Sequence, residues 1–432
     1  MEAPSSTLYD VLIIGGGPGG SSIGTLLARK GWRVALLEKD RHPRFHIGES
    51  LLPHNNPLLE ALGVLPEIEA IGIVKPGAEF DSKYHGKSQV FNFADALDKS
   101  LPTAFQVHRS DFDNILLRNA QRNGVAVFEE TRALQVDFAQ DGVRVRSEGL
   151  AGDQAWDARF LIDASGRDTF LAGQLHTKVA NRKHNSAAIF GHYEGASRHA
   201  GPAAGNISIY WFDHGWMWFI PLARGVTSVG AVCWPYYLKS RQTNLEQFLD
   251  DTIATVPALA ERLVHARRIA PVTATGNYSY EAARACGANY LMVGDAFAFV
   301  DPIFSSGVYL AMSSAFVGAE AVDTALRDPA SAPALMRKHE RRMRRAIRIF
   351  KWFIYRMTTP TMRMLIMDPK NVLGVVEGLI AFLAGDIFRR NGVHWRVTIF
   401  KGIYYLGNAC APLRSWTAMR KRRINIRPVS GA

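Results

Sequence analysis

The sequence predicts an α/β protein in which a Rossmann-like dinucleotide-binding lobe is joined to an antiparallel sheet and a helical C-terminal region. An apolar run of strand length at residues 9–14 leads directly into a glycine-rich turn and a helical stretch, as at the start of a βαβ unit. Residues 186–234 alternate between apolar and polar side chains with glycines between them, which is typical of antiparallel strands. After Pro329 the periodicity is helical, with breaks at Pro360, Pro369 and Pro412.

The glycine-rich turn has the pattern G-x-G-x-x-G, formed by Gly15, Gly17 and Gly20. Gly15 permits the tight turn, Gly17 lets the backbone approach a pyrophosphate, and Gly20 lets helix and strand pack closely. The N-terminus of the following helix attracts the negative charge of the phosphates. The second strand ends at Glu38, whose carboxylate is expected to accept hydrogen bonds from a ribose diol. These residues predict a dinucleotide site.

The order of the predicted elements indicates that the domains are discontinuous in sequence. The dinucleotide-binding domain is expected from residues 1–75, 105–170 and 288–330, and the substrate domain from 76–104 and 171–287. Within them we expect helices at 18–29, 111–123 and 240–268, a strand at 33–37 and three strands ending at Asp163. Residues 331–432 form the helical C-terminal region, and the antiparallel sheet is the expected floor of the substrate site.

Length and composition exclude several classes of protein. At 432 residues, 47% hydrophobic and 21% charged, the chain is a globular protein too long for one ordinary core. Its three cysteines are widely spaced and predict neither a metal site nor a disulfide framework. No apolar stretch reaches the ~18 residues that span a bilayer, because Glu377 and Asp386 interrupt the best candidate, 372–388, which we expect to be a core helix. No signal peptide is visible, so a cytoplasmic location is expected.

A carboxylate far along the chain indicates which dinucleotide binds. Residues 291–296 have the pattern of a buried strand that runs into a turn containing Asp295. An NAD site closes within two consecutive mononucleotide-binding halves and needs no such return. A carboxylate at this position can hold the ribityl or pyrophosphate part of an extended FAD, so the sequence predicts FAD.

Six segments together resemble the flavoprotein monooxygenase superfamily and, within it, the flavin-dependent halogenases. They are GGGPGG at 15–20, IGESLLP at 47–53, VHRSDFD at 107–113, FLIDASGRD at 160–168, WMWFIP at 216–221 and GDAFAFVDPIFSSGV at 294–308. They span most of residues 8–320, and the tryptophan motif, IGESLLP and DPIFSSGV are the specific ones. The resemblance implies a monooxygenase-type FAD domain with further cofactor contacts from Lys39, Arg44, Glu49, Ser50, Arg109, Pro302, Gly307 and Val308.

The resemblance also implies the reaction. Members of the family use reduced FAD, O2 and a halide ion, chloride or bromide, to make hypohalous acid, which halogenates an electron-rich aromatic ring. Consecutive N–H groups at the helix start in 301–308 suit an anion, and Ser306 and Gly307 are where the family binds halide. Trp216 and Trp218 share one strand face and would separate substrate from flavin, which favours halogenation over hydroxylation. A separate flavin reductase is expected, because no second glycine-rich motif for NADPH is visible.

Lys75 is the candidate for the reacting amine. It begins KPGAEF at 75–80, which is similar to the K-x-G-A-x-F segment of halogenases acting on phenols and pyrroles, where the lysine hydrogen-bonds or captures hypohalous acid. Burial lowers the pKa of a lysine and would suit it to this role. Lys83 and Lys87 remain alternatives, because one sequence does not fix the register.

Phe304 departs from the tryptophan halogenases, which carry a glutamate at the aligned position that assists deprotonation of the substrate. A small activated phenol or pyrrole, free or tethered to an acyl carrier protein, therefore fits better than free tryptophan. An aromatic hydroxylase of the same superfamily and a geranylgeranyl-type ene-reductase are the alternative functions.

Much of the net charge of +12 lies on one predicted helix. Residues 337–351 contain eight Lys or Arg and a single acidic residue, Glu340, beside an apolar stripe of Met343, Ile347, Phe350, Ile354 and Met357. Such a helix fits a solvated face, an anionic lipid surface or an acidic partner. Because several members of the family act on carrier-tethered substrates, docking of an acidic carrier is the preferred hypothesis. No nucleic-acid recognition motif accompanies the charge.

Overall fold

A mostly parallel sheet forms the core of one half of the protein, in a computed structural model that describes residues 8–150, 152–181, 183–276, 279–389 and 392–426. Its central strand, β1 (Leu8–Ile14), lies between β2 (Val34–Leu37) and β10 (Gln154–Asp163), and pairs with both in parallel. The short strands β7 (Ala126–Phe128) and β19 (Tyr290–Met292) extend it on either side. The predicted strands at 9–14 and 33–37 are confirmed.

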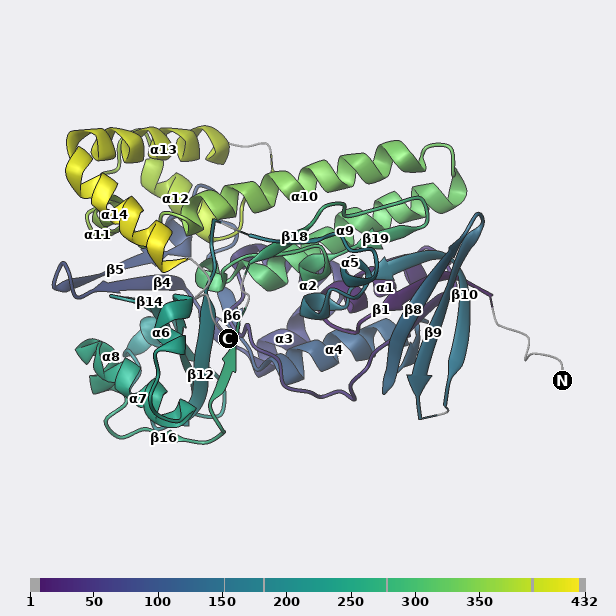
Figure 1. Cartoon of the computed structure of the whole chain (residues 1–432), viewed down its shortest axis with the longest axis horizontal. Coiled ribbons are helices and arrows are strands. Elements are labelled where there is room, and N and C mark those ends of the chain that lie inside the picture. Colours follow the sequence, from purple (N-terminus) through teal and green to yellow (C-terminus); the bar gives the residue numbers. More distant parts are fainter. Residues whose placement is uncertain (1–7, 151, 182, 277–278, 390–391, 427–432) are drawn as a thin grey trace.

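Three helices cover one face of this sheet (Figure 1). Alternate residues of β1, Val11 and Ile13, pack into one apolar cluster with side chains of α1 (Pro18–Arg29), α4 (Arg109–Arg122) and α9 (Ser306–Arg327). The predicted helices at 18–29 and 111–123 are confirmed, the second beginning two residues earlier than expected. The helix α9 returns to the sheet almost 300 residues after the glycine-rich turn. The first residues of α9 and the glycine-rich turn line the same cavity.

The segment before Asp163 holds one strand more than predicted. Antiparallel β8 (Thr131–Ala139) and β9 (Gly142–Gly149) pair in turn with the beginning of β10, which gives the expected three strands. The extra strand is β7, whose three residues are too few to show a period in sequence.

A second sheet lies at the other end of the molecule (Figure 1). Its antiparallel strands β12 (Ala187–Glu194), β15 (Val226–Cys233), β14 (Gly215–Pro221) and β13 (Ile207–Phe212) confirm the prediction for 186–234. β4 (Gly77–Ser82) joins β13 in parallel and is followed by β5 (Lys87–Asn92), while β16 (Arg267–Arg268) and β17 (Thr273–Thr275) pair with β12. Every residue of β13, β14 and β15 is buried, so neither face of these strands is solvated.

Helices cover the outer face of this second sheet. α7 (Leu245–Ala254) and α8 (Pro257–Arg262) pack on its apolar side chains, so the helical prediction for 240–268 holds in part, as two short helices that end before β16. The remaining short elements are α2 (Asn56–Leu62), α3 (Leu65–Ile71), α5 (Phe170–Gln174), α6 (Pro235–Lys239), the pair β3 (Ile73–Lys75) and β6 (Ala104–Gln106), and the strands β11 (Lys178–Ala180), β18 (Tyr280–Ala282) and β20 (Ala298–Phe299).

The C-terminal region is helical, as predicted. α10 (Ala332–Ile354) runs along one long side of the molecule to a group formed by α11 (Pro360–Met367), α12 (Val375–Leu383), α13 (Val393–Cys410) and α14 (Pro412–Asn425) (Figure 1). Pro360 and Pro412 each begin a helix, as their missing N–H and fixed φ allow. The stretch 372–388 contains the buried helix α12, which confirms a core helix there.

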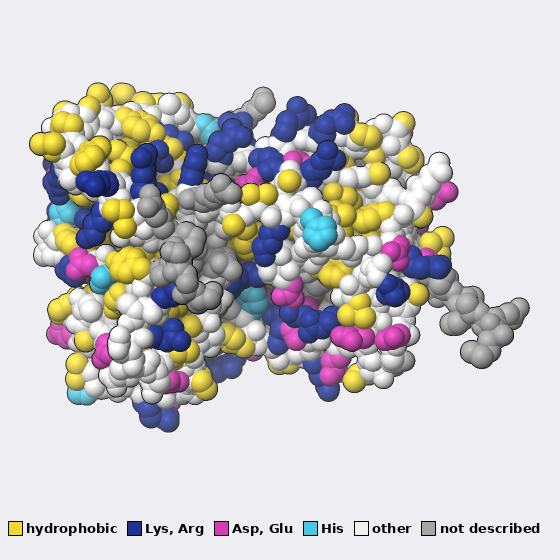
Figure 2. Space-filling view, in the orientation of Figure 1, with side chains coloured by type: hydrophobic (Ala, Val, Ile, Leu, Met, Phe, Trp, Pro, Cys, Tyr) yellow, Lys and Arg dark blue, Asp and Glu magenta, His cyan; other side chains and the backbone are white. Residues whose placement is uncertain are grey.

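The basic helix α10 is amphipathic as expected, with one difference. All five residues of its predicted apolar stripe are buried. Six of the eight basic residues are exposed and gather on the surface in Figure 2, but Arg344 and Lys351 turn inward and pair with Glu281. Glu281 lies far from α10 in sequence, so the pattern of the helix alone could not reveal these pairs.

Among the described residues, no helix has the length and hydropathy needed to cross a bilayer, and no three metal-binding side chains cluster.

Candidate active site

A cavity of about 590 Å³ opens where the carboxyl ends of β1, β10 and β19 meet β14 and the start of α9. Its wall combines the glycine-rich turn, the loop at 44–50, and residues of α4, β14 and the turn at 301–308. Ligands of open α/β sheets bind outside the carboxyl ends of the strands, and the volume is within the range of small-molecule sites. The cavity is therefore the candidate active site.

Each glycine of the turn is needed for a different physical reason. Gly15 has φ +102°, and a Cβ there would lie 2.4 Å from the carbonyl oxygen of Ala164. A Cβ on Gly20 would lie 1.9 Å from the carbonyl oxygen of Gly15, so the turn can be this tight only with glycine at position 20. Gly17 lines the cavity, and its nearest neighbour would be Arg44 at 3.8 Å. Only Gly17 thus keeps its space free for a ligand.

Glu38 lies in the cavity wall at the end of β2, as predicted. Its carboxylate accepts hydrogen bonds from the amides of Gly16, at 2.6 Å, and Asp40, at 2.9 Å. These bonds fix the carboxylate beside the glycine-rich turn. Lys39, also in the wall, pairs with Asp168.

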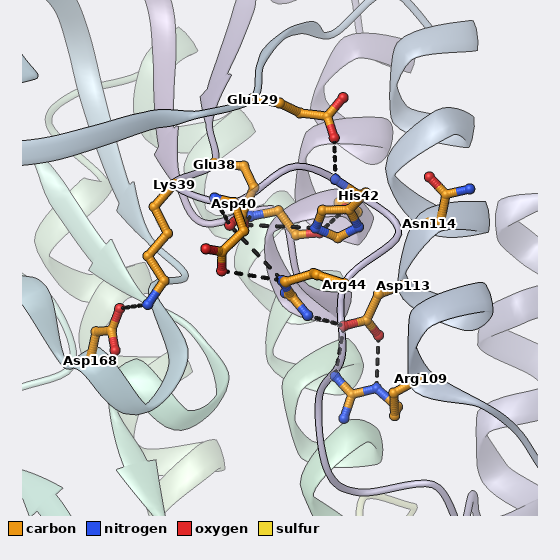
Figure 3. Close-up of polar contacts among 12 residues, drawn as sticks. Glu38, Lys39, Asp40, His42, Arg44, Arg109, Asp113, Asn114, Glu129 and Asp168 are labelled. Atoms are coloured by element: carbon orange, nitrogen blue, oxygen red, sulfur yellow. Dashed lines mark hydrogen bonds and ion pairs between the residues drawn. The ribbon is translucent and has the colours of Figure 1, made fainter. Parts of the chain in front are cut away.

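Arg44 and Arg109 are joined by a residue that sequence reasoning missed. Asp113 is fully buried and accepts hydrogen bonds from Arg109, at 2.8 and 2.9 Å, and from Arg44, at 3.1 Å (Figure 3). Burial opposes ionisation of Asp113, but the adjacent guanidinium groups of Arg109 and Arg44 outweigh it and lower its pKa. One buried anion therefore holds two cavity-lining cations in place. The spacing of four between Arg109 and Asp113 on a helix was the available signal.

Asp295 follows β19 and lines the same cavity as the glycine-rich turn. Burial raises the pKa of its carboxyl group to about 7, against the opposing effect of Arg167 and Arg109. A half-buried carboxyl group at a cavity wall is suited to hydrogen-bond a ligand hydroxyl group.

Glu49 and Ser50 lie side by side in the wall, as predicted. One carboxylate oxygen of Glu49 is 2.7 Å from Nε2 of His192 on β12, and the other is buried without a partner among the described residues. His192 was not predicted, because a lone histidine on a strand carries no motif. The contact between Glu49 and His192 links the loop at 44–50 to the second sheet.

Trp216 and Trp218 point from one face of β14 into the cavity wall, with ring centroids 5.9 Å apart. The indole N–H of Trp216 donates to Asp301 at 3.2 Å, and that of Trp218 donates to Ser228 at 3.1 Å. A Cβ on Gly230 of the neighbouring strand would lie 2.4 Å from the Trp218 ring, so this glycine makes room for the indole. Both rings are fixed by hydrogen bonds and packing.

Asp301 connects the tryptophan motif to the C-terminal helices. Besides Trp216, its carboxylate contacts Nε2 of His184, at 2.9 Å, and the hydroxyl group of Ser186, at 3.2 Å. Nδ1 of His184 lies 3.2 Å from Arg422 of α14. Burial lowers the pKa of Arg422 to about 10. This chain of contacts joins residues from four distant parts of the sequence.

The turn after Asp301 leads into α9. Asp301 accepts a hydrogen bond from the amide of Ile303, as a capping residue does, and Ser305 takes a left-handed conformation with φ +54°. Gly307 lines the cavity, and a Cβ there would meet no atom within 4 Å. Pro302 and Val308 also line the cavity, whereas Ser306 lies behind the wall with its buried hydroxyl group unpartnered among the described residues.

Lys75 is buried at the end of β3, with 1% of its surface exposed. Its amine donates to the hydroxyl group of Ser50 at 2.8 Å and to the carbonyl oxygen of Leu51 at 3.0 Å. Burial lowers its pKa to about 7. The cavity wall contains Ser50 but not Lys75, so the amine lies directly behind the wall. Lys83 pairs with Asp213 and Lys87 is exposed, and neither lines the cavity.

Phe304 is surrounded by aromatic rings of the C-terminal helices. Its ring centroid lies 5.3 Å from that of Phe382 and 6.1 Å from that of Phe353. The Phe304 side chain is thus part of an apolar cluster.

The residues present fit FAD. The clear space at Gly17, the fixed Glu38, the paired Arg44 and Arg109, and the half-buried Asp295 line one cavity together with the turn before α9. These are the features expected for the pyrophosphate, ribose, ribityl and flavin ends of the cofactor.

The comparison with protein families gives one match over most of the chain. A family model described as "Tryptophan halogenase" matches residues 10–100 and 89–363. The curated relatives include the "Tryptophan 2-halogenase" of Chondromyces crocatus, 36% identical over 336 residues, or 74% of this chain and 62% of the relative. A "1H-pyrrole-2-carbonyl-[peptidyl-carrier protein] chlorinase" of Pseudomonas fluorescens is 30% identical over 409 residues, or 88% of this chain and 90% of the relative. The chain thus spans less than two thirds of the first relative and most of the second.

Solved structures agree with the sequence comparison. The myxobacterial chondrochloren halogenase CndH, described as a new variant of FAD-dependent halogenases, has a TM-score of 0.78 at 33% identity, covering 93% of this chain and 97% of that protein. The flavin-dependent brominase Bmp2 has a TM-score of 0.79 at 26% identity, covering 92% and 98%.

Proposed function

The chain belongs to the flavin-dependent halogenases, the family whose model is described as tryptophan halogenase, and we propose that it halogenates an electron-rich aromatic ring with reduced FAD, O2 and chloride or bromide. One observation carries the proposal. A single cavity joins the glycine-rich turn to the tryptophan pair, and the buried amine of Lys75 lies directly behind its wall.

Bound reduced FAD supplies the electrons with which O2 and halide give hypohalous acid. Gly17, Glu38, Arg44, Arg109 and Asp295 hold the cofactor. Gly307 and the first amides of α9 form the halide end, since the first N–H groups of a helix have no intrahelical acceptor. Ser306 contributes its backbone there, because its hydroxyl group lies behind the wall.

Lys75 is the residue that directs the oxidant. With a pKa of about 7 its amine is partly neutral near neutral pH. The charged form can donate a hydrogen bond to hypohalous acid, and the neutral form can take the halogen as the O–halogen bond breaks, giving a haloamine and water. Ser50 bonds to Lys75 and lines the cavity, and so connects the amine with the site. Trp216 and Trp218 form the wall between cofactor and substrate.

The substrate class follows from Phe304. The aromatic cluster around it contains no base that could deprotonate a poorly activated ring. A phenol or pyrrole reacts without such a base, and we propose it in preference to free tryptophan. The pyrrole-carrier chlorinase, similar over 90% of its length, supports a carrier-tethered form, and the exposed basic residues of α10 supply a docking surface for an acidic carrier.

The test is turnover of the purified protein with FAD, a flavin reductase, O2 and bromide against a panel of free and carrier-tethered phenols and pyrroles, followed by mass spectrometry. A brominated product is expected. A product heavier by one oxygen atom would instead identify a hydroxylase, and a reduced double bond without O2 an ene-reductase.

A further inference from the structure

The end of the chain has a charge unlike the rest of it. Residues 387–432 contain ten Lys or Arg and no Asp or Glu. The whole chain has 51 basic and 39 acidic residues, so the remainder carries 51 − 10 = 41 basic and 39 acidic and is almost neutral. The stretch that contains α13 and α14 thus has ten basic residues with no acidic residue to balance them, whereas the basic residues of α10 are offset by acidic residues elsewhere in the chain.

The helix α13 presents an uncharged stripe to solvent. Its exposed residues recur three or four apart, as one face of a helix does, and are Trp395, Thr398, Gly402, Tyr405, Leu406, Ala409 and Cys410. Leu406 is 68% exposed and Tyr405 52%. The solvent face of a helix is normally charged, so a stripe with large apolar side chains and no charge indicates an interaction surface.

The helix α14 adds more apolar side chains and the charge. Leu413, Trp416, Met419 and Ile424 are all exposed, Leu413 by 80%. Between them lie the exposed side chains of Arg414, Arg420, Lys421 and Arg423. Figure 2 shows apolar atoms gathered over this group of helices with Lys and Arg among them.

We propose that α13 and α14 bind the surface of an anionic lipid bilayer. Trp and Tyr favour the boundary between headgroups and acyl chains, and Leu and Ile enter it, while Lys and Arg contact the lipid phosphates. The helices lie on the bilayer, since no described helix could cross it.

The two other kinds of partner fit less well. A second copy bound through the same surface would place the exposed Arg414, Arg420, Lys421 and Arg423 of α14 against the same residues of its partner, and neither α13 nor α14 contains a carboxylate to pair with them. An acidic carrier protein would pair with the basic residues, but it would find no charge along the stripe of α13. A lipid surface satisfies both the charge and the apolar stripe.

Flotation of the FAD-loaded full chain with vesicles tests the proposal. Vesicles of phosphatidylcholine with one quarter phosphatidylglycerol should carry the protein upward, and pure phosphatidylcholine should not. Arg420→Gln with Arg423→Gln should weaken binding by about 30-fold, because each basic residue near an anionic surface contributes about 1 kcal/mol. Leu413→Ser with Trp416→Ser should also weaken binding to the vesicles, although the net charge of the protein does not change. The control is Arg146→Gln with Arg241→Gln, two exposed residues elsewhere.

Every outcome of the flotation experiment either supports or overturns the proposed membrane binding. All variants should keep bound FAD and the wild-type melting temperature, since every changed side chain is exposed. Equal flotation of the control and the α14 variants would overturn the proposal. An absence of flotation with anionic vesicles would also overturn it, and dimerisation through α13 and α14 or carrier binding that these variants abolish would then identify the partner of this surface.

Discussion

The amine of Lys75 donates a 2.8 Å hydrogen bond to the hydroxyl group of Ser50, and only the second of these residues lines the cavity. A buried lysine needs partners, and Ser50 and the carbonyl oxygen of Leu51 provide them. In the proposed mechanism, reactants in the cavity would reach the Lys75 amine by way of the position that Ser50 occupies.

Lys75→Ala should fold, bind FAD and oxidise reduced flavin, but form no halogenated product. The step assigned to the lysine follows flavin oxidation, so hydrogen peroxide should accumulate in place of product. Mass spectrometry and a peroxide assay measure the two. Lys83→Ala, at a surface ion pair, is the matched control and should halogenate normally. Undiminished halogenation by Lys75→Ala would remove this residue from the mechanism.

Stability should also depend on pH through Lys75. Its pKa is about 7 when folded and about 10.5 when unfolded, so between these values the unfolded chain binds more protons and folding becomes more favourable as pH rises. Below pH 7 the cost of burying the charge is complete and amounts to a few kcal/mol, at about 1.4 kcal/mol per pKa unit. Lys75→Met removes it. The stability difference between variant and wild type in urea should therefore shrink from pH 6 to pH 10, and a constant difference would contradict the assignment.

Gly17→Val should lower FAD affinity by 100-fold or more while the protein remains folded. Its Cβ has free space on the protein side, but the side chain projects where the pyrophosphate must lie. Asp295→Ala should also lose FAD. Gly20→Ala gives the contrasting result, misfolding, because its Cβ would overlap the Gly15 carbonyl group. Flavin absorbance after gel filtration and a melting curve separate the two effects.

Displacing Trp218 should change the products. Trp218→Ala opens the wall, and Gly230→Ala pushes the indole aside, because the new Cβ would lie 2.4 Å from the ring. Both variants should raise the ratio of hydroxylated to halogenated product severalfold. Trp218→Phe keeps most of the wall and should stay close to wild type. An unchanged ratio in both variants would mean that the tryptophan does not separate substrate from cofactor.

Arg341→Glu with Arg345→Glu should weaken binding of an acidic carrier protein by about tenfold and leave the reaction of small free phenols unchanged. Both side chains are exposed, and they lie four apart on α10. The wild-type advantage should disappear towards ~0.5 M salt, where the Debye length falls below about 5 Å. Surface plasmon resonance at two salt concentrations measures the affinity for the carrier. An affinity that changes neither with the charge reversal nor with salt would show that α10 does not dock the carrier.

Local patterns predicted most of the fold. The strand at 9–14, the helix at 18–29 and the proline-started C-terminal helices were readable because their periodicity and end signals lie within a few residues. The inward turn of Arg344 and Lys351 was not readable, because their partner Glu281 is brought to them by the tertiary fold.

The site residues likewise fall into those with a local sequence signal and those that depend on tertiary contacts. Gly17, Glu38, Arg44 and Asp295 line the cavity where motifs predicted them. His192 and His184 escaped prediction, because each acts through a contact with another segment and has no motif of its own. Asp113 was missed although its spacing of four from Arg109 on one helix was a signal. The burial of Lys75 was likewise hidden, since it depends on the pairing of β3 with β6.

The contact between Arg422 and His184 has a practical meaning for protein engineering. Because His184 contacts Asp301, and Asp301 accepts a hydrogen bond from the Trp216 indole, a shortened chain that stops before Pro412 would lose a support of the cavity wall. Trimming the basic tail to improve solubility or crystals would thus remove a support of the cavity wall, whereas replacing exposed side chains of α14 would leave this chain of contacts intact.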